Sequence, residues 1–463
     1  MSRELERFPR MPRVRRRVFL GGVVTGAAAL LAACGGAASP APTGGGAVAT
    51  TAGASVAPAS GGKKKDVLFW GRQQFLAESN NYLTESVKLA AQKGNFNVKV
   101  ELFTNDEHAQ KEVVAMESGN VPDITYTYAP ALWYRNGYGM DVQPLYDEIG
   151  KAGGGWIDFA APSSTYKGVR VCVPMNNEPW FLHLRKDIFE GAGYQLPITS
   201  WDTFLEALKK VNAPDKGLWA YDGQMTEADW TGNCLQFMWA HGGRLFDKDG
   251  NPTIDTPQNV AGVTAYTDLF KNKEMPPDVV SQLASGNNEA WLSKKTAAVS
   301  NPGSIVLAMR KDDKDLLSKT YLQAFPVKGK DKTYVQTAGA AALVINKKSQ
   351  AIDEAGQIAK MIMAPDRYPT QLEKAGSYWF SILKNYLSID FFTNDPWNRQ
   401  ITENIVPWTI PANAEGGLNP ILDDIGISAT KDMLQAIVVQ NKRPEEAIKI
   451  LADAAAKAKE KFK

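Results

Sequence analysis

The first third of the folded region alternates short apolar runs with amphipathic helical patterns. Residues 67–70 are apolar, residues 79–92 repeat apolar side chains at helical spacing, and residues 97–103 alternate apolar with polar positions. A second helical pattern at 108–118 precedes a third apolar run at 124–128. This β-α-β-α-β order predicts a parallel sheet with helices on its faces. Ligands of such sheets bind beyond the carboxyl ends of the strands, where Trp70, Arg72 and Tyr126 stand.

The stretch from residue 166 to residue 201 concentrates side chains suited to ligand binding. Residues 166–168 predict a turn, and residues 169–173 alternate as a strand would. Pro174 ends that strand because it has no N–H to donate. A second short strand is predicted at 181–184. Between the two strands stand Asn176, Asn177, Glu178 and Trp180, and a polar, aromatic loop in this position favours ligand binding over core packing.

From residue 145 helical and strand patterns are mixed. Helices are predicted at 201–211, 229–240, 257–272, 350–363 and 444–463, and strands at 296–300, 321–325 and 340–345. Asn301, Gly303 and Ser304 follow the strand at 296–300. Ser304 is placed to cap the next helix, and Gly303 would let the backbone approach a ligand closely.

The N-terminus has the pattern of an export signal. A basic region with Arg16 and Arg17 precedes an apolar run at 18–33, which is too short for a comfortable membrane span. Arg16-Arg17 resembles the twin-arginine motif, and Cys34 ends a sequence that resembles a bacterial lipobox, so we expect a lipid on Cys34. Residues 35–65 are mainly Gly, Ala, Ser, Thr and Pro and predict a flexible tether. A plain membrane anchor, or a fortuitous cysteine, is the alternative, and the export route, twin-arginine or general, is left open.

Composition narrows the possible functions. A chain of 463 residues exceeds one ordinary core, so two lobes are expected. The net charge of +2 gives no sign of nucleic acid as a partner. With 3 histidines, no metal-type His/Cys spacing and no Walker-type glycine loop, we expect no metal, no cofactor and no catalytic residues. Cys172 and Cys234 are either a disulfide or two buried thiols.

Several short pieces stand in a family order across most of the chain after residue 66. They are residues 121–123, 166–174, 185–189, 198–204, 295–303, 339–349 and 443–447. Together they resemble the extracellular solute-binding proteins of ABC importers, in the sugar-binding branch. Two departures concern the ligand more than the fold: Leu184-Arg185 replaces the usual Tyr-Asn, and Phe380-Ser381 replaces a frequent proline.

The resemblance implies a two-lobed α/β fold of the periplasmic-binding-protein type (type II), with a ligand cleft between the lobes. It would assign residues 66–142 and 334–368 to lobe 1, and residues 143–333 and 369–463 to lobe 2. It also implies the positions of the ligand-binding residues, which in this chain are Trp70, Arg72, Asp123, Tyr126, Asn176, Asn177, Glu178, Trp180, Asn301, Gly303, Ser304 and Trp379. Asp123 equally suits a structural role as a turn or cap residue.

A carbohydrate suits these side chains. Aromatic rings cover the C–H face of a pyranose, and carboxylates, amides and arginine bond its hydroxyls; Trp180 beside Glu178 combines both, and Trp230 and Trp379 are candidates for a second platform. We therefore expect a monomer at the outer face of the bacterial membrane that binds a mono- or oligosaccharide and delivers it to an ABC permease. A binder of another solute, such as a polyol phosphate or polyamine, and a lipid-anchored glycoside hydrolase are the alternatives.

Overall fold

The computed structural model describes residues 64–226, 230–283, 285–329, 334–411 and 417–461. The predicted export signal, Cys34 and nearly all of the predicted tether lie outside these residues. The side chain of Trp230, one of the predicted ligand residues, is also not described.

A five-stranded sheet contains the three strands predicted at the start of the folded region. Its order is β2 (Asn97–Phe103), β1 (Asp66–Arg72), β3 (Ile124–Thr127), β14 (Ala342–Ile345) and β6 (Val173–Pro174). β1 runs parallel to β2 and β3, as the β-α-β order predicts, whereas β14 is antiparallel to both β3 and β6. The sheet is therefore completed by strands from far along the chain.

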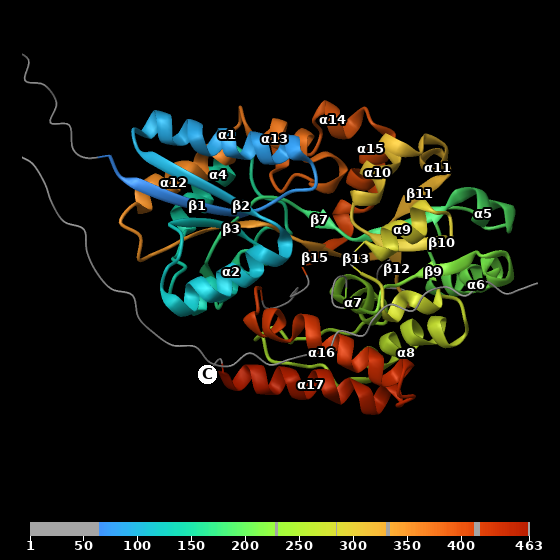
Figure 1. The fold of residues 1–463 in the computed structure, drawn as a ribbon. Coiled ribbons are helices and arrows are strands. Elements are labelled where there is room, and N and C mark those ends of the chain that lie inside the picture. Colours follow the sequence, from blue (N-terminus) through green and yellow to red (C-terminus); the bar gives the residue numbers. More distant parts are fainter. Residues whose placement is uncertain (1–63, 227–229, 284, 330–333, 412–416, 462–463) are drawn as a thin grey trace, which may run out of the picture. The chain divides into compact units, whose positions relative to one another are not determined.

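Helices cover both faces of this sheet (Figure 1). One face packs against α1 (Ala77–Gly94), α12 (Ile352–Ile362), α4 (Gln143–Ala152) and α13 (Tyr368–Ala375), and the other against α2 (Asn105–Ser118) and α3 (Pro130–Arg135). Phe69, Leu83, Val87, Ile124 and Leu343 have no exposed surface between the sheet and the first group. Because α4 packs on α12 and β6 pairs with β14, this group of elements extends beyond the expected boundary at residue 142.

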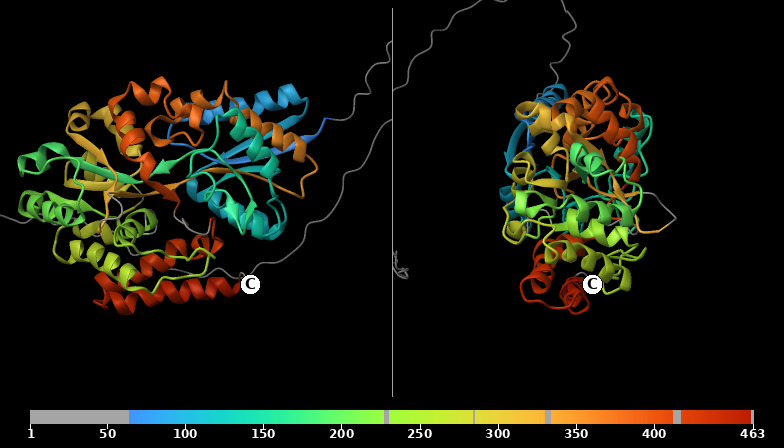
Figure 2. Two further views of the ribbon diagram at one scale, coloured as in Figure 1. Left: turned by 180° about the vertical axis from the view of Figure 1, so that it is seen from behind. Right: turned by 90° about the vertical axis from the view of Figure 1, so that its right-hand side faces the viewer.

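A second sheet of four strands has the order β11 (Thr320–Gln323), β8 (Phe181–Arg185), β10 (Thr296–Asn301) and β9 (Trp219–Asp222). β8 is antiparallel to both of its neighbours, and β9 is parallel to β10. The helices around it are α5 (Lys186–Gly191), α6 (Trp201–Val211), α7 (Trp230–Ala240), α8 (Pro257–Lys271), α9 (Gly286–Leu292), α10 (Ser304–Asp312), α11 (Lys314–Ser318), α14 (Asp390–Thr393) and α15 (Pro396–Asn404). The C-terminal helices α16 (Pro420–Val438) and α17 (Pro444–Lys461) lie together and contact α8 (Figure 2).

Helix α6 shows how the sequence forms these elements. It has the predicted bounds, and the Ser200 hydroxyl accepts a hydrogen bond from Thr203 N at 3.4 Å at its start. Trp201, Phe204 and Leu208 are buried along one face, as the helical spacing requires.

The strand predicted at 169–173 is wrong in one respect, because it is two strands. Lys167 and Gly168 have φ values of 47° and 80°, and this turn folds β4 (Thr165–Tyr166) back on β5 (Val169–Arg170) as a hairpin. Residue 173 then starts β6, which joins the five-stranded sheet.

Two antiparallel chain passages join the two sheets. One runs from β13 (Tyr334–Gly339) into β14, and the other from β6 through β7 (Glu178–Pro179) into β8. They are bonded along their length, because β6 pairs with β14 and β7 with β13, and Trp180 N donates to Thr337 O at 3.0 Å. β13 also pairs with β12 (Phe325–Pro326) and β15 (Thr409–Pro411). The predicted polar loop therefore lies where the chain passes between the sheets.

Candidate functional site

Polar side chains meet at the carboxyl ends of β1 and β3. Arg72, the last residue of β1, has its guanidinium carbon 4.7 Å from the centre of the Tyr128 ring. The Tyr128 hydroxyl donates to Glu178 Oε2 at 2.7 Å and lies 3.3 Å from the Tyr126 hydroxyl, which accepts a bond from Gln74 Nε2. We call these residues, together with Tyr378, the tyrosine cluster.

The charges of the tyrosine cluster depend on one another. Burial raises the pKa of Glu178, which is 4% exposed, while the Arg72 charge and hydrogen bonds from Tyr378 and Tyr128 oppose that rise. Burial alone would lower the pKa of Arg72, but its interactions with Tyr128, Tyr378, Tyr126 and Glu178 raise it. Burial also raises the pKa of Tyr126 to about 12 and that of Tyr128 and Tyr378 well above the ordinary value. The three phenols therefore keep their protons and act as neutral hydrogen-bonding groups around one cation and one carboxyl.

Aromatic rings surround the tyrosine cluster. Trp379 is fully buried, with its ring edge-to-face with Tyr126 at 5.9 Å. Phe75, in the loop after β1, is 58% exposed and packs edge-to-face on Tyr378 at 4.7 Å. Phe75, Gln74 and Tyr378 are not among the predicted ligand residues. The sequence could have indicated all three residues. Gln74 and Phe75 stand in the loop after β1, and Tyr378 directly precedes Trp379.

A second polar group lies at the carboxyl ends of β9 and β10. Asp222, the last residue of β9, is fully buried, and its Oδ2 accepts a hydrogen bond from Gln282 Nε2 at 2.9 Å. Burial raises the pKa of Asp222 to about 7. Gln224, Asn233 and Ser300 lie buried in the same region, and we call these five residues the amide cluster.

The amide cluster contains buried hydrogen-bonding atoms that have no partner among the residues that the structure describes. They are Asp222 Oδ1, Gln224 Oε1, Asn233 Nδ2, Gln282 Oε1 and Ser300 Oγ. Leaving such an atom unpaired costs about 1–3 kcal/mol, so hydrogen bonds from a bound ligand would stabilise this cluster. None of these five residues was predicted as a ligand residue. The sequence feature that could have indicated them is the polar segment Asp222-Gly223-Gln224 at the end of a strand.

Comparison with known proteins identifies the family of this chain. Residues 76–366 match the family of bacterial extracellular solute-binding proteins, which is more than half of the chain. The chain belongs to this family. YcjN of Escherichia coli K12, named as an ABC transporter periplasmic-binding protein, is 25% identical over 182 residues. That match covers 36% of this chain and 40% of YcjN, and a binding protein of Brucella abortus strain 2308 is 23% identical over 128 residues, 28% of this chain and 31% of that protein. The chain thus spans less than half the length of these relatives.

Solved structures show the two-lobed α/β fold. A sugar transporter of Arthrobacter chlorophenolicus A6 with bound laminaribiose superposes with a TM-score of 0.71 at 18% identity, covering 85% of this chain and 99% of that one. A solute-binding protein of Thermotoga lettingae TMO with bound α-D-tagatose gives 0.68 at 22% identity, covering 85% and 100%. A maltose-bound protein of T. maritima, MalE3, gives 0.66 at 19% identity, covering 84% and 99%. The expected fold is confirmed.

Two predicted ligand residues of this solute-binding protein lie away from the tyrosine cluster's hydrogen bonds. Asp123 stands before β3, at the opposite end of that strand, where its Oδ2 accepts from Leu68 N at 2.7 Å and its Oδ1 from the Ser349 hydroxyl at 2.5 Å. These contacts to the backbone and to Ser349 fit the structural role, as a turn or cap residue, that the sequence also allowed for Asp123. Trp70 packs edge-to-face on Phe103 at 5.4 Å.

Asn176 bonds one chain passage to the other, and Asn177 bonds its passage to β15. Asn176 Oδ1 accepts from Ala341 N at 2.7 Å, and Asn177 Nδ2 donates to the Thr409 hydroxyl at 2.8 Å. The side chain of Trp180 is partly exposed. Of the four residues predicted as one ligand loop, Glu178 belongs to the tyrosine cluster, and the Asn176 side chain lies beside it and interacts with the Glu178 carboxyl.

The predicted residues at the end of β10 and the start of α10 form a separate contact. The capping role expected of Ser304 is wrong, because Gly303 is the N-cap of α10 and no described side chain caps this helix. Asn301 Nδ2 donates to Asn288 Oδ1 and, at 3.2 Å, to the Ser304 hydroxyl. A side-chain carbon on Gly303 would lie 1.7 Å from Ser377 O, so the glycine serves the approach of two backbone segments. This contact holds the start of α10 against the segment that carries Tyr378 and Trp379.

Cys172 and Cys234 are both free and buried, so they do not form the disulfide that the sequence left open. The described residues contain no group of three or more His, Cys, Asp or Glu side chains placed to hold a metal ion. None of the described helices is both long and apolar enough to cross a membrane.

Proposed function

We propose that this solute-binding protein captures a carbohydrate between the tyrosine cluster and the amide cluster and delivers it to an ABC permease. The observation that carries the proposal is the set of five buried, unpartnered hydrogen-bonding atoms of the amide cluster. A ligand rich in hydroxyls would supply their partners.

A continuous series of contacts links the two clusters. Asp222 is in register with Val299 of β10, and β10 leads to Gly303. Gly303 lies against Ser377, the residue before Tyr378, and Tyr378 bonds Glu178. The two clusters therefore belong to one region of the fold, beside the passages that join its sheets.

The chemistry of the two clusters suits neutral hydroxyls. A hydroxyl donates one hydrogen bond and accepts others, and the amide cluster offers three unpartnered acceptors (Asp222, Gln224 and Gln282) beside donors on Asn233 and Ser300. The exposed ring of Phe75 and the partly exposed ring of Trp180 offer surfaces for the C–H faces of a sugar. The ligands in the similar solved structures, laminaribiose, tagatose and maltose, are also sugars.

The setting of the protein is part of the proposal. We place residues 66–142 and 334–368 in lobe 1 together with α4, β6 and α13, which pack on its sheet, and the remaining residues of 143–333 and 369–463 in lobe 2. A lipid on Cys34 would hold the monomeric protein at the outer face of the membrane, and residues 35–65 would be its tether. No catalytic role is assigned to any residue.

Thermal unfolding of the mature chain with added solutes tests this function. Laminaribiose, maltose, tagatose and ribitol represent sugars and polyols, and spermidine and glycerol phosphate represent the alternative solutes. A ligand at 100 times its Kd stabilises the folded state by about 2.7 kcal/mol, so a true ligand raises Tm measurably. A rise with spermidine or glycerol phosphate, and with none of a broad panel of mono- and oligosaccharides, would contradict the carbohydrate proposal.

The hydrolase alternative is tested in the same samples. We expect every stabilising sugar to be recovered unchanged after prolonged incubation, as measured by chromatography. Release of shorter sugars at a rate that falls in a Glu178→Gln variant would show a glycoside hydrolase instead.

A further inference from the structure

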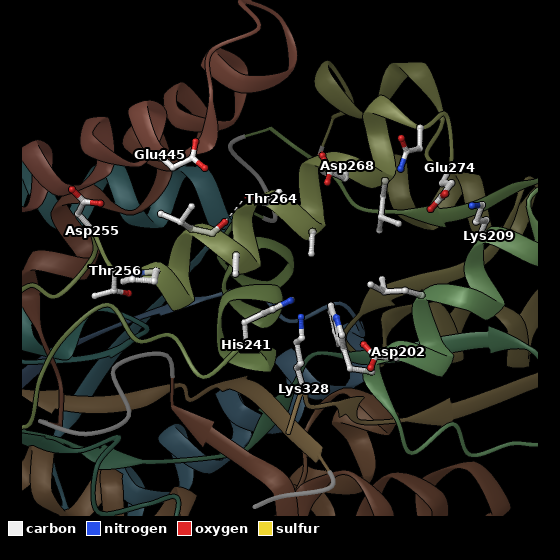
Figure 3. Close-up of a pocket in the computed structure, with 18 residues that line it drawn as sticks. Asp202, Lys209, His241, Asp255, Thr256, Thr264, Asp268, Glu274, Lys328 and Glu445 are labelled. Atoms are coloured by element: carbon white, nitrogen blue, oxygen red, sulfur yellow. Dashed lines mark hydrogen bonds between the residues drawn. The ribbon is translucent and has the colours of Figure 1, made fainter. Parts of the chain in front are cut away.

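A groove lies between α6 and α8, away from both polar clusters (Figure 3). Its volume is about 890 Å³, and none of its lining residues belongs to the tyrosine or amide cluster. Trp201 and Leu205 of α6 line one side, and Val260, Ala261 and Ala265 of α8 line the other. We call it the α6–α8 groove.

The floor of the groove is apolar. Trp201 is 2% exposed and packs edge-to-face on His241 at 4.9 Å, which fixes the base of the groove. Ala261 and Ala265 are one helical turn apart on α8, and their small side chains would let another helix approach closely. α8 extends for 15 residues, which is about 22 Å of helix and enough to lie along roughly four turns of a partner helix.

The rim of the groove is acidic. Four carboxylates that are at least partly exposed line it against two lysines: Asp202, Asp255, Asp268 and Glu445 against Lys209 and Lys328. A fifth, Glu274, is buried beside Lys209. His241 Nδ1 bonds Phe237 O at 2.9 Å, and burial lowers the pKa of His241, so the imidazole adds no positive charge near neutral pH. In Figure 3 the carboxylates of Asp255, Asp268 and Glu445 lie along the α8 side, while His241, Lys328 and Asp202 lie side by side across from α8.

We propose that the α6–α8 groove binds an amphipathic helix of another protein, apolar along one face and carrying Lys or Arg on its flanks. An apolar floor between two helices is the surface on which amphipathic helices dock. The surplus of carboxylates along the rim selects a basic partner and would speed its association. This surface is independent of the solute site, so the protein can hold its solute and this partner at the same time.

Photo-crosslinking from the groove in intact cells that produce the protein tests this proposal. Ala261→Cys, on the exposed face of α8, carries a benzophenone maleimide, and Ala456→Cys, on the exposed face of α17, is the matched control. Cys172 and Cys234 do not compete for the label, because burial raises the pKa of both thiols. The wild-type chain gives the background, including any product from Cys34.

We expect position 261, and not position 456, to yield one discrete product. Its partner peptide, identified by mass spectrometry, should be an apolar helix with flanking Lys or Arg. The proposal is overturned if position 261 gives no product above the control, if the product is two copies of this chain, or if the partner peptide is acidic. A small molecule retained in the groove, seen as an added mass in native mass spectrometry and lost on substitution of Ala261 by Trp, would also overturn it.

A synthetic copy of the crosslinked peptide then tests the acidic rim. Asp202→Asn with Asp268→Asn should weaken peptide binding to the full chain about tenfold, measured by fluorescence anisotropy at low salt. Asp453→Asn, an exposed carboxylate of α17 outside the groove, should leave the affinity unchanged. Equal affinity of the double variant and the wild-type chain would refute the charge argument, provided both have the same Tm.

Discussion

At the scale of the residue, Glu178 is the carboxyl on which the tyrosine cluster depends. It is nearly buried, and its charge is tolerated because Arg72 lies close and because Tyr128 and Tyr378 donate to it. A buried charge whose partner is removed is far less stable than the intact pair. Solute binding should therefore depend on Glu178 more than on any exposed carboxylate.

We predict that Glu178→Gln weakens solute binding at least about tenfold, because an amide cannot balance Arg72 or accept two phenol hydrogen bonds equally well. Isothermal titration with the solute found in the thermal screen measures the change. Glu190→Gln, an exposed residue of α5, is the control and should bind as the wild-type chain does.

The two tryptophans that flank the cluster in sequence should behave differently. Trp379 is fully buried, so we predict that Trp379→Ala lowers the free energy of unfolding by about 3–5 kcal/mol. Trp180 is partly exposed, and Trp180→Ala should weaken solute binding with a smaller loss of stability. Denaturant unfolding and titration of both variants separate the two effects; undiminished affinity in Trp180→Ala would remove this residue from the site.

The raised pKa of Asp222 predicts that the free energy of unfolding depends on pH. Its pKa is about 7 in the folded protein and near 3.8 when unfolded, so the folded state binds more protons between these values. Its contribution to stability is therefore greatest below pH 4 and is lost as the pH rises through 7. Between pH 5 and pH 8 the loss is about 3 kcal/mol.

Urea unfolding at pH 5 and pH 8 should show this loss in the wild-type chain and a flatter profile in Asp222→Asn. Asp215→Asn, an exposed residue in the turn before β9, should keep the wild-type slope. If Asp222→Asn and the wild-type chain lose stability equally, Asp222 ionises normally in the folded state.

At the scale of the element, the sequence predicted those helices and strands whose formation depends on residues close together in the chain. The strands β1 to β3 and the helix α6 follow from apolar periodicity and caps that lie within a few residues of each other. The insertion of β14 between β3 and β6 does not, because it joins residues far apart in the chain. Glu178 and Arg72 could be named from the sequence, because each stands in a polar segment beside a predicted strand. The structural hydrogen bonds of Asn176, Asn177 and Asp123 could not be predicted, because they join residues far apart in the chain.

The amide cluster was missed for a related reason. Its members come from β9, α7, β10 and the segment after Val280, and each alone is an ordinary polar residue. Only the fold shows that their hydrogen-bonding atoms are buried together and unpartnered among the described residues.

Two glycines give opposite predictions at this scale. In Gly303→Ala the new carbon would meet the backbone oxygen of Ser377, so the variant should lose about 1–3 kcal/mol of stability and also displace Tyr378. Gly356, inside α12, has open space around it, so Gly356→Ala should gain about 0.5–1 kcal/mol. Denaturant unfolding measures both; a stable Gly303→Ala variant would mean that this contact is loose.

At the scale of the whole molecule, the solute site and the α6–α8 groove use different elements. The first depends on both sheets and on the passages that join them, whereas the second depends on α6, α8 and their neighbours. Variants in the groove should therefore leave the Tm shift caused by the solute unchanged.

The N-terminal prediction belongs to this scale as well. We predict that Cys34→Ala abolishes incorporation of labelled palmitate and releases the protein from the membrane into the medium, because a single cysteine would carry the anchor. Fractionation followed by immunoblotting measures the distribution. A Cys34→Ala protein that stays with the membrane would favour the plain anchor.

The position of β14 has a consequence for biosynthesis. Chain growth on the ribosome delivers β1, β2 and β3 early, but the outer edge of β3 has no partner until residues 342–345 have been translated. An open strand edge invites wrong pairing, and long-range pairing is slow to form. The nascent chain should therefore need protection from aggregation for most of its synthesis, and truncated products that end before residue 342 should be insoluble.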